Sequence, residues 1–282
     1  MNATLLTLAL ALTPAADNYP NSKILIEADA LLKVDLKTVL ILDARGEKAY
    51  LAGHIPGAVR LPTAEWSKAV PDTPGAWAKR LAQIGVTSDT PVVVYAEVRD
   101  AARAWWLLKY AGVEDVRLLN GGFPAWEKTS GDSEAKMNAA RPIKPGKPAV
   151  LSDRLAEKKD LQAILKDNSS QIFDARSDSE YCGTAVDLNK RNGHIPGAVA
   201  LEWSDLLTSD KKFKSPEELK KLFAERNVDL GKPAVTYCQS GGRAAVLAFG
   251  LELMGAKHVR NYYKSWAEWG NADDTPVEVP KK

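Results

Sequence analysis

Short apolar runs alternate with longer amphipathic stretches along this chain, and the alternation predicts strands separated by helices. In the first part, strand-like runs cover 24–26, 38–42, 91–95 and 116–119, and helical patterns cover 27–33, 77–84 and 101–111. Apolar strands separated by helices are typical of a mainly parallel sheet with helices on both faces. Such sheets bind ligands at the loops that follow the carboxyl ends of their strands, so we expect functional residues there.

The pattern occurs twice. GHIPGAV at Gly53–Val59 recurs letter for letter at Gly193–Val199, an offset of 140 residues (193 − 53). Weaker matches keep the same order and pair LILDAR with QIFDAR, VVVY with AVTY, and Val116 with Val259. The sequence therefore predicts two tandem α/β domains, at residues 20–130 and 149–282. Residues 131–148 are polar, carry three prolines and two glycines, and are predicted to form a linker.

The first sixteen residues predict a secretory signal. The apolar run LLTLALAL, at residues 5–12, precedes TPAA and is too short to span a bilayer. No Lys or Arg precedes Lys23, so the basic segment of a signal is missing. We expect an exported, periplasmic protein, and the alternative is a cytoplasmic protein with a loosely packed apolar start.

Composition narrows the function classes. The net charge of +2 with 26% charged residues gives no field directed at nucleic acid or at a membrane surface. Two cysteines make no disulfide framework, and three separated histidines have no metal-ligand spacing, so neither a metal nor another cofactor is expected. The composition sets no oligomeric state and is compatible with a monomer.

One loop in the second domain carries the candidate chemistry. The strand-like run Ala234–Tyr237 ends at Cys238, and a helical pattern follows the loop until Gly255. A thiol at a helix N-terminus is favoured as the thiolate and becomes nucleophilic. In the first copy Tyr95 is followed by AEVRD, which has no thiol, has two carboxylates and is about one residue shorter. We therefore expect a silent first domain and a catalytic Cys238.

These motifs together resemble the tandem-domain rhodaneses, a family of thiosulfate and 3-mercaptopyruvate sulfurtransferases. The resemblance covers residues 20–275 and includes the paired DAR and GHIPGA motifs, the Cys238 loop and the run SWAEWG at Ser265–Gly270. It implies two α/β domains with the active site in the second, facing the domain interface. It also implies that Cys238 takes sulfane sulfur from a small anionic donor, as a persulfide, and passes it to cyanide or a thiol.

The resemblance and the loop chemistry assign roles to individual residues. Backbone N–H groups of the glycine-containing loop can converge on a persulfide anion, Ser240 can add a hydroxyl donor, and Arg243 can pair with the donor's anionic group. The predicted persulfide- and substrate-binding residues are Gln239, Ser240, Gly241, Gly242 and Arg243. Asp174 and Arg176 are expected at the edge of the site or in a structural salt bridge. Cys182 is expected to be a bystander, with a redox role as the alternative.

Several alternatives stay open. Cys238 and Arg243 are separated by four residues, whereas phosphatases of related fold use five, so phosphatase or arsenate-reductase activity is less favoured. Arg243 and Gln239 favour thiosulfate as donor with release of sulfite, because mercaptopyruvate enzymes resemble CGSGVT here and lack a terminal cation. Glu180 stands near the position where animal thiosulfate enzymes carry an arginine, and this weighs against thiosulfate. A persulfide carrier or binding module without turnover is the non-enzymatic alternative.

Overall fold

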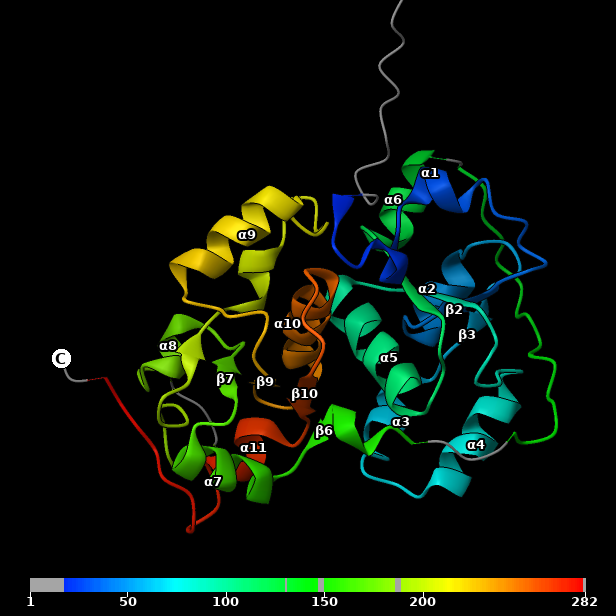
Figure 1. The fold of residues 1–282 in the computed structure, drawn as a ribbon. Helices are drawn as coiled ribbons and strands as arrows, with labels where there is room; N and C mark the ends of the chain where they lie inside the picture. The colour runs from blue at the N-terminus through cyan, green and yellow to red at the C-terminus, as the bar shows by residue number, and fades with distance from the viewer. Residues whose placement is uncertain (1–17, 130, 147–149, 186–188, 281–282) are drawn as a thin grey trace, which may run out of the picture.

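Two five-stranded parallel sheets, each flanked by helices, form the chain (Figure 1). The computed structural model describes residues 18–129, 131–146, 150–185 and 189–280. This arrangement confirms the predicted pair of α/β domains. The predicted signal at residues 1–16 lies outside the described residues. None of the helices in the described ranges has both the length and the apolar character needed to cross a bilayer.

The first sheet has the strand order β1-β5-β4-β2-β3, and all its neighbouring strands are parallel. Its strands are β1 (Leu25–Ile26), β2 (Leu40–Asp43), β3 (Val59–Arg60), β4 (Val92–Tyr95) and β5 (Val116–Leu119). The helices of this domain are η2 (Ser22–Ile24), α1 (Ala28–Leu31), α2 (Glu47–Ala52), α3 (Thr63–Ser67), α4 (Pro74–Gln83), α5 (Val98–Tyr110) and α6 (Gly122–Thr129).

The second sheet repeats this order as β6-β10-β9-β7-β8. Its strands are β6 (Leu155–Ala156), β7 (Gln171–Asp174), β8 (Val199–Ala200), β9 (Ala234–Tyr237) and β10 (Val259–Tyr262). The register repeats as well, because Asp174 lies opposite Tyr237 as Asp43 lies opposite Tyr95. The helices are η3 (Ser152–Arg154), α7 (Lys158–Asp167), α8 (Asp178–Tyr181), η4 (Trp203–Leu206), α9 (Pro216–Glu225), α10 (Gly242–Leu253) and α11 (Ser265–Trp269).

Several predicted element boundaries were wrong. Helix α5 begins at Val98 rather than at residue 101, because Glu97 adopts the extended N-cap conformation and Asp100 stands in the first turn, where the helix dipole favours a carboxylate. Ile24 belongs to a 3₁₀ turn and the strand begins one residue later. The short helices α2 and α3 were not predicted, since helices of five or six residues give almost no periodic signal.

Helices α5 and α10 pack against each other at the centre of the molecule, between the two sheets (Figure 1). Helix α10 is apolar on nearly every side, as expected of a helix with no solvent-facing stripe, whereas α5 is amphipathic and places Arg99 at the surface. Trp105 meets Phe249 edge to face, with ring centroids 4.8 Å apart. One hydrophobic core therefore continues from the first domain into the second, and each sheet has a smaller core on its outer face.

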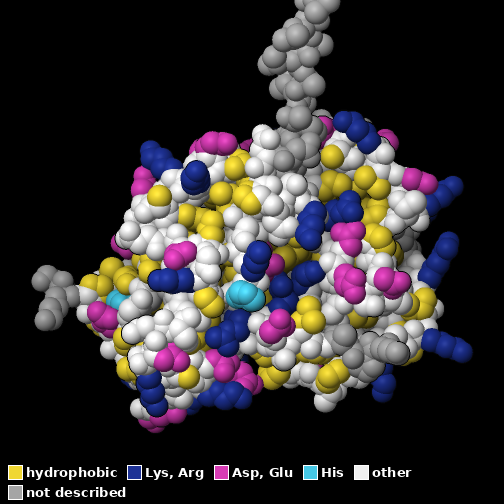
Figure 2. All heavy atoms as spheres, viewed as in Figure 1, with side chains coloured by type: hydrophobic (Ala, Val, Ile, Leu, Met, Phe, Trp, Pro, Cys, Tyr) yellow, Lys and Arg dark blue, Asp and Glu magenta, His cyan; other side chains and the backbone are white. Residues whose placement is uncertain are grey.

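The predicted linker runs along the outer side of the first domain (Figure 1). Glu134 and His54 exchange backbone hydrogen bonds of 3.0 and 2.9 Å, and Ile143 N–H donates to Ala82 O at 3.0 Å. These contacts fix the segment on the surface, although it contains no regular helix or strand over 135–146. Figure 2 shows Lys and Arg side chains mixed with Asp and Glu over the visible face of the molecule.

Candidate active site

Cys238 lies where β9 ends and the connection to α10 begins. Its residue is 1% exposed, in the central core shared by both domains. Gly241 closes the connection with a φ of +80° and serves as the N-cap of α10. The backbone N–H of Ser240 donates to Cys238 Sγ at 3.4 Å. The sulfur therefore lies beside the positive end of a helix and accepts a hydrogen bond, and both contacts favour a sulfur anion.

The Ser265 hydroxyl holds this loop in shape. It accepts from the N–H of Cys238 and from the N–H of Gly241, each at 3.1 Å, and it donates to Tyr262 O at 2.7 Å. Ser265 is fully buried and has a φ of +56°, a left-handed conformation that costs a non-glycine residue about 1–2 kcal/mol. The corresponding Gly122 of the first domain has a φ of +58°. A serine retained in this conformation indicates that its hydroxyl is needed.

The other polar groups of the loop are also engaged. Trp266 N–H donates to Cys238 O at 2.9 Å, and Ala267 N–H donates to Gln239 O at 3.1 Å. Asn261 Nδ2 donates to Gly241 O at 3.0 Å. The carbonyl oxygens of Cys238, Gln239 and Gly241 therefore all accept hydrogen bonds from residues of β10 and α11. The loop is therefore rigid before any substrate arrives.

The Gln239 and Arg243 side chains reach the segment between Arg176 and Gly193, which is longer than its counterpart between Arg45 and Gly53. Gln239 exchanges side-chain hydrogen bonds of 3.0 and 3.2 Å with Asn189. Arg243 binds Glu180 through both carboxylate oxygens, at 2.6 and 2.8 Å. Glu180 also forms a capping box with Ser177 at the start of α8. This segment thus supports one side of the Cys238 loop.

The Glu180–Arg243 pair is strongly ionised. Partial burial opposes the ionisation of Glu180, but the Arg243 guanidinium and the Ser177 hydrogen bonds lower its pKa to about 2. Burial also opposes the charge of Arg243, yet Glu180 and the Cys238 sulfur raise the pKa of Arg243 above its ordinary value. The predicted donor-binding cation therefore already has a carboxylate partner.

Asp174 and Arg176 form a buried bidentate salt bridge, with contacts of 2.6 to 3.1 Å. Arg176 also donates to Gly193 O at 2.7 Å. Asp43 and Arg45 repeat this geometry in the first domain, where the cysteine is missing. An arrangement that is present in both copies supports the fold of each domain, in agreement with the predicted structural salt bridge.

The first domain has no thiol at the equivalent point. Residues 96–97 connect β4 to α5, whereas residues 238–241 connect β9 to α10, so the first connection is two residues shorter. The prediction of about one residue was too small, because α5 begins earlier than expected. Ala96 follows the strand directly, and a Cβ built at Gly122 would lie 2.3 Å from Ala96 O. This close approach leaves no room there for a copy of the Ser265 side chain.

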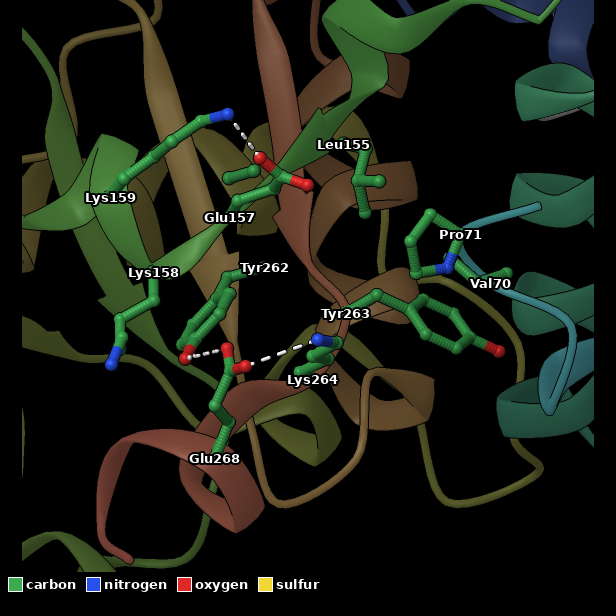
Figure 3. A pocket seen from close by; sticks show the side chains of 11 residues that line it. Val70, Pro71, Leu155, Glu157, Lys158, Lys159, Tyr262, Tyr263, Lys264 and Glu268 are labelled. Atoms are coloured by element: carbon green, nitrogen blue, oxygen red, sulfur yellow. Dashed lines mark hydrogen bonds and ion pairs between the residues drawn. The ribbon is translucent and has the colours of Figure 1, made fainter. Parts of the chain in front are cut away.

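Tyr263 of the second domain connects the Cys238 loop to residues of the first domain. Tyr263 lies against Gly241, where an added Cβ would come within 2.8 Å of its ring, and it stacks on Trp106 of α5 at 4.9 Å. Burial raises the pKa of Tyr263 to about 12, so its hydroxyl stays protonated. Figure 3 shows this side chain pointing toward Val70 and Pro71 of the first domain, across a cavity of about 220 Å³.

The two domains cover each other's loops reciprocally. Lys212 of the second domain binds Glu27 at 2.8 Å, and the N–H of Phe213 donates to Asn120 Oδ1 at 3.0 Å. Asn120 lies at the position that Tyr263 occupies in the second domain. The segment after η4 therefore covers the loop region of the first domain, whereas Val70 and Pro71 cover that of the second.

Sequence reasoning missed Ser265 and the contact between Glu180 and Arg243 as parts of the site. The repeat offset of 143 residues, from Val116 to Val259, places Ser265 opposite Gly122 and could have identified the serine. No comparable signal exists for Glu180, which lies 63 positions before its partner. Among the described residues, no three His, Cys, Asp or Glu side chains gather as a metal site.

Known proteins resemble the chain over most of its length. Residues 27–129 and 157–272 each match the family model of the Rhodanese-like domain. A thiosulfate sulfurtransferase of Corynebacterium glutamicum is 32% identical, over 94% of both chains. A 3-mercaptopyruvate sulfurtransferase of Escherichia coli K12 is 32% identical, over 88% of this chain and 95% of the relative. The sulfur carrier protein TtuD of Thermus thermophilus is 34% identical, over 81% of this chain and 86% of the relative.

Solved structures agree with this assignment. EanB, captured with a persulfide and ergothioneine, superposes with a TM-score of 0.84 at 25% identity, over 94% of this chain and 72% of that one. Wild-type EanB gives a TM-score of 0.83 at 26% identity, over 93% and 70%. Both halves of the chain match one domain family, and full-length relatives exceed 30% identity. The chain therefore belongs to the rhodanese-like family, as a sulfurtransferase built from two tandem domains.

Proposed function

We propose that the chain is a thiosulfate sulfurtransferase in which Cys238 carries the transferred sulfur. The observation that supports this most directly is the buried Cys238 thiol at the start of α10, with the Ser240 N–H directed at its sulfur. A persulfide is an anion, and the helix N-terminus with its N–H groups would stabilise it. Burial of the loop would protect the persulfide from water and from stray thiols.

The reaction consists of two displacements. The Cys238 thiolate attacks the outer sulfur of thiosulfate, a new S–S bond forms, and sulfite leaves with the electron pair of the broken bond. Cyanide or a thiolate then attacks the terminal sulfur of the persulfide. The electron pair of the S–S bond returns to Cys238, and thiocyanate or a new persulfide leaves. The first domain, with Ala96 at the equivalent position, stays silent and supplies one wall of the site.

The loop suits a single sulfur atom better than a phosphate. A phosphate cradle needs several free backbone N–H groups that converge on one anion. Here the N–H groups of Cys238 and Gly241 are taken by the Ser265 hydroxyl. The loop is also one residue shorter than the C-x5-R loop of phosphatases. Both features support sulfur transfer over phosphatase or arsenate-reductase chemistry.

3-Mercaptopyruvate is the second candidate donor. Relatives of equal identity, 32%, carry each of the two names, so similarity does not choose between the donors. The Glu180 carboxylate on Arg243 also reduces the positive charge available to thiosulfate. We propose that Arg243 stabilises the Cys238 sulfur through its field while it stays paired with Glu180.

Cyanolysis with the two donors, side by side, tests the proposal. We expect thiocyanate from both donors, with the larger kcat/KM for thiosulfate, and none from the Cys238→Ser variant. A larger kcat/KM with 3-mercaptopyruvate would assign the alternative donor. If neither donor yields thiocyanate, the result would contradict enzymatic turnover and favour a persulfide carrier.

A further inference from the structure

Arg103 of the first domain reaches the Cys238 loop of the second. It lies on α5, and a Cβ built at Gly242 would stand 2.1 Å from Arg103 Nη2. Gly242 begins α10 without a positive φ, so its backbone conformation would accept any residue. A side chain at this position would therefore have to displace the Arg103 guanidinium. The loop and Arg103 are fitted to each other across the domain interface.

The Arg103 guanidinium has no partner of its own. Within residues 18–280, apart from the undescribed gaps, it makes no hydrogen bond and no ion pair, and its Nε is buried from solvent. Arg45, Arg176 and Arg243, by contrast, each bind a carboxylate through two contacts. An unpaired guanidinium beside the positive end of α10 is electrostatically unfavourable, because like charges repel there. A bound anion would remove this cost.

Arg103 also faces a cavity large enough for a small donor. The cavity has a volume of about 420 Å³ and is lined by the first domain, including Arg45, Arg60, Glu65 and Asp100. Arg45 and Arg60 are paired with Asp43 and Glu47, and Asp100 is paired with Arg99. Glu65 is exposed, so water screens its charge, whereas Arg103 is only partly exposed and its Nε is buried. The least screened uncompensated charge of this cavity is therefore positive.

We propose that Arg103 binds the anionic group of the sulfur donor beside the Cys238 loop, so that the silent domain completes the active site. This inference rests on the proposed sulfur transfer. A guanidinium presents parallel N–H donors that match two oxygens of a sulfonate or carboxylate. Arg103 thereby performs the donor recognition that sequence reasoning had assigned to Arg243, whose charge Glu180 already compensates. Cyanide lacks such an oxygen pair, so the effect is specific to the donor step.

Steady-state kinetics of Arg103→Gln test the proposal, with Arg117→Gln as matched control. Arg117 lies on β5 of the first domain, is 37% exposed and is not among the residues that line the cavity. Loss of a charge-assisted pair predicts a rise of about 10- to 100-fold in the KM for thiosulfate. The KM for cyanide is expected to stay unchanged in Arg103→Gln, and Arg117→Gln is expected to match wild type. Arg103→Lys, which keeps the charge, is expected to restore part of the affinity.

A binding measurement separates this inference from the proposed function. Sodium sulfate, a source of an unreactive oxyanion, is expected to raise the Tm of wild type and of Arg117→Gln more than that of Arg103→Gln at equal ionic strength. This difference would support the anion site even if wild type transferred no sulfur, an outcome that would refute only the proposed function. Equal sulfate shifts in all three proteins, together with thiosulfate KM values within about twofold, would overturn the role of Arg103.

Discussion

Replacing Ser265 with alanine removes one hydroxyl and leaves two buried N–H groups of the catalytic loop without an acceptor. Those groups belong to Cys238 and Gly241, and both contacts are 3.1 Å in the structure. Each buried donor left unpaired costs about 1–3 kcal/mol, so Ser265→Ala is expected to lower the free energy of unfolding by about 2–6 kcal/mol. Displacement of the loop is expected to slow persulfide formation by about 10- to 100-fold, because reacting atoms must be aligned closely.

A glycine variant separates the effect of losing the hydroxyl from the effect of the strained backbone at Ser265. Ser265→Gly also loses the hydroxyl, but glycine adopts a φ of +56° without steric cost. Ser265→Gly is therefore expected to be more stable than Ser265→Ala by about 1 kcal/mol, while persulfide formation is slowed in both. Urea unfolding followed by tryptophan fluorescence measures the stability, and the single-turnover release of sulfite measures the rate.

Thr275→Val is the matched control. The Thr275 hydroxyl is buried and donates to Trp269 O at 2.7 Å, yet it makes no contact with the Cys238 loop. This variant should lose stability and keep its rate of persulfide formation. Wild-type stability together with a wild-type rate in Ser265→Ala would refute the role of the Ser265 hydroxyl. A Ser265→Gly variant less stable than Ser265→Ala would refute the strain assigned to the left-handed φ.

Two further predictions concern charge and the domain interface. The pKa of Glu180 is about 2, against an ordinary 4.5, so its ionisation stabilises the fold by up to about 3 kcal/mol above pH 4.5, and this contribution is lost as the pH falls toward 2. In urea unfolding, the difference in free energy of unfolding between wild type and Glu180→Gln should be smaller at pH 3 than at pH 7. A difference that does not change with pH would contradict the pairing with Arg243. Trp105→Ala removes a fully buried ring that packs on Phe249, so we expect the free energy of unfolding to fall by about 3–5 kcal/mol. We also expect the two domains to melt separately in calorimetry, whereas a single transition at the wild-type Tm would refute the shared core.

The internal repeat made most of the fold predictable. GHIPGAV at both positions, with the DAR motifs before it, fixed two copies of one sheet, and the β5 strand was predicted with its correct bounds. The strand–loop–helix arrangement around Cys238 was predictable for the same reason, because the first copy shows the same arrangement without the thiol. Repeated motifs and strand patterns can be recognised in the sequence because each depends only on residues that are close together along the chain.

Contacts between segments that lie far apart in the sequence were not predictable. Arg103 meets Gly242 only because α5 and α10 pack together, and helix packing between domains leaves no periodic trace in either segment. Glu180 reaches Arg243 from α8, and the equivalent residue of α2 in the first copy is Ala49, which has no carboxylate. Ser265 looked like an ordinary residue of the SWAEWG run, since a left-handed φ at a serine runs against its intrinsic preference.

Mass spectrometry of the protein after brief treatment with thiosulfate shows directly whether Cys238 carries the transferred sulfur. We expect one added sulfur atom on the peptide that contains Cys238, its removal by cyanide as thiocyanate, and no addition in Cys238→Ser. Cys182→Ser, which removes the other thiol, should be loaded and discharged like wild type. Sulfur found on Cys182, or thiocyanate formed by Cys238→Ser, would show that Cys238 is not the sulfur carrier.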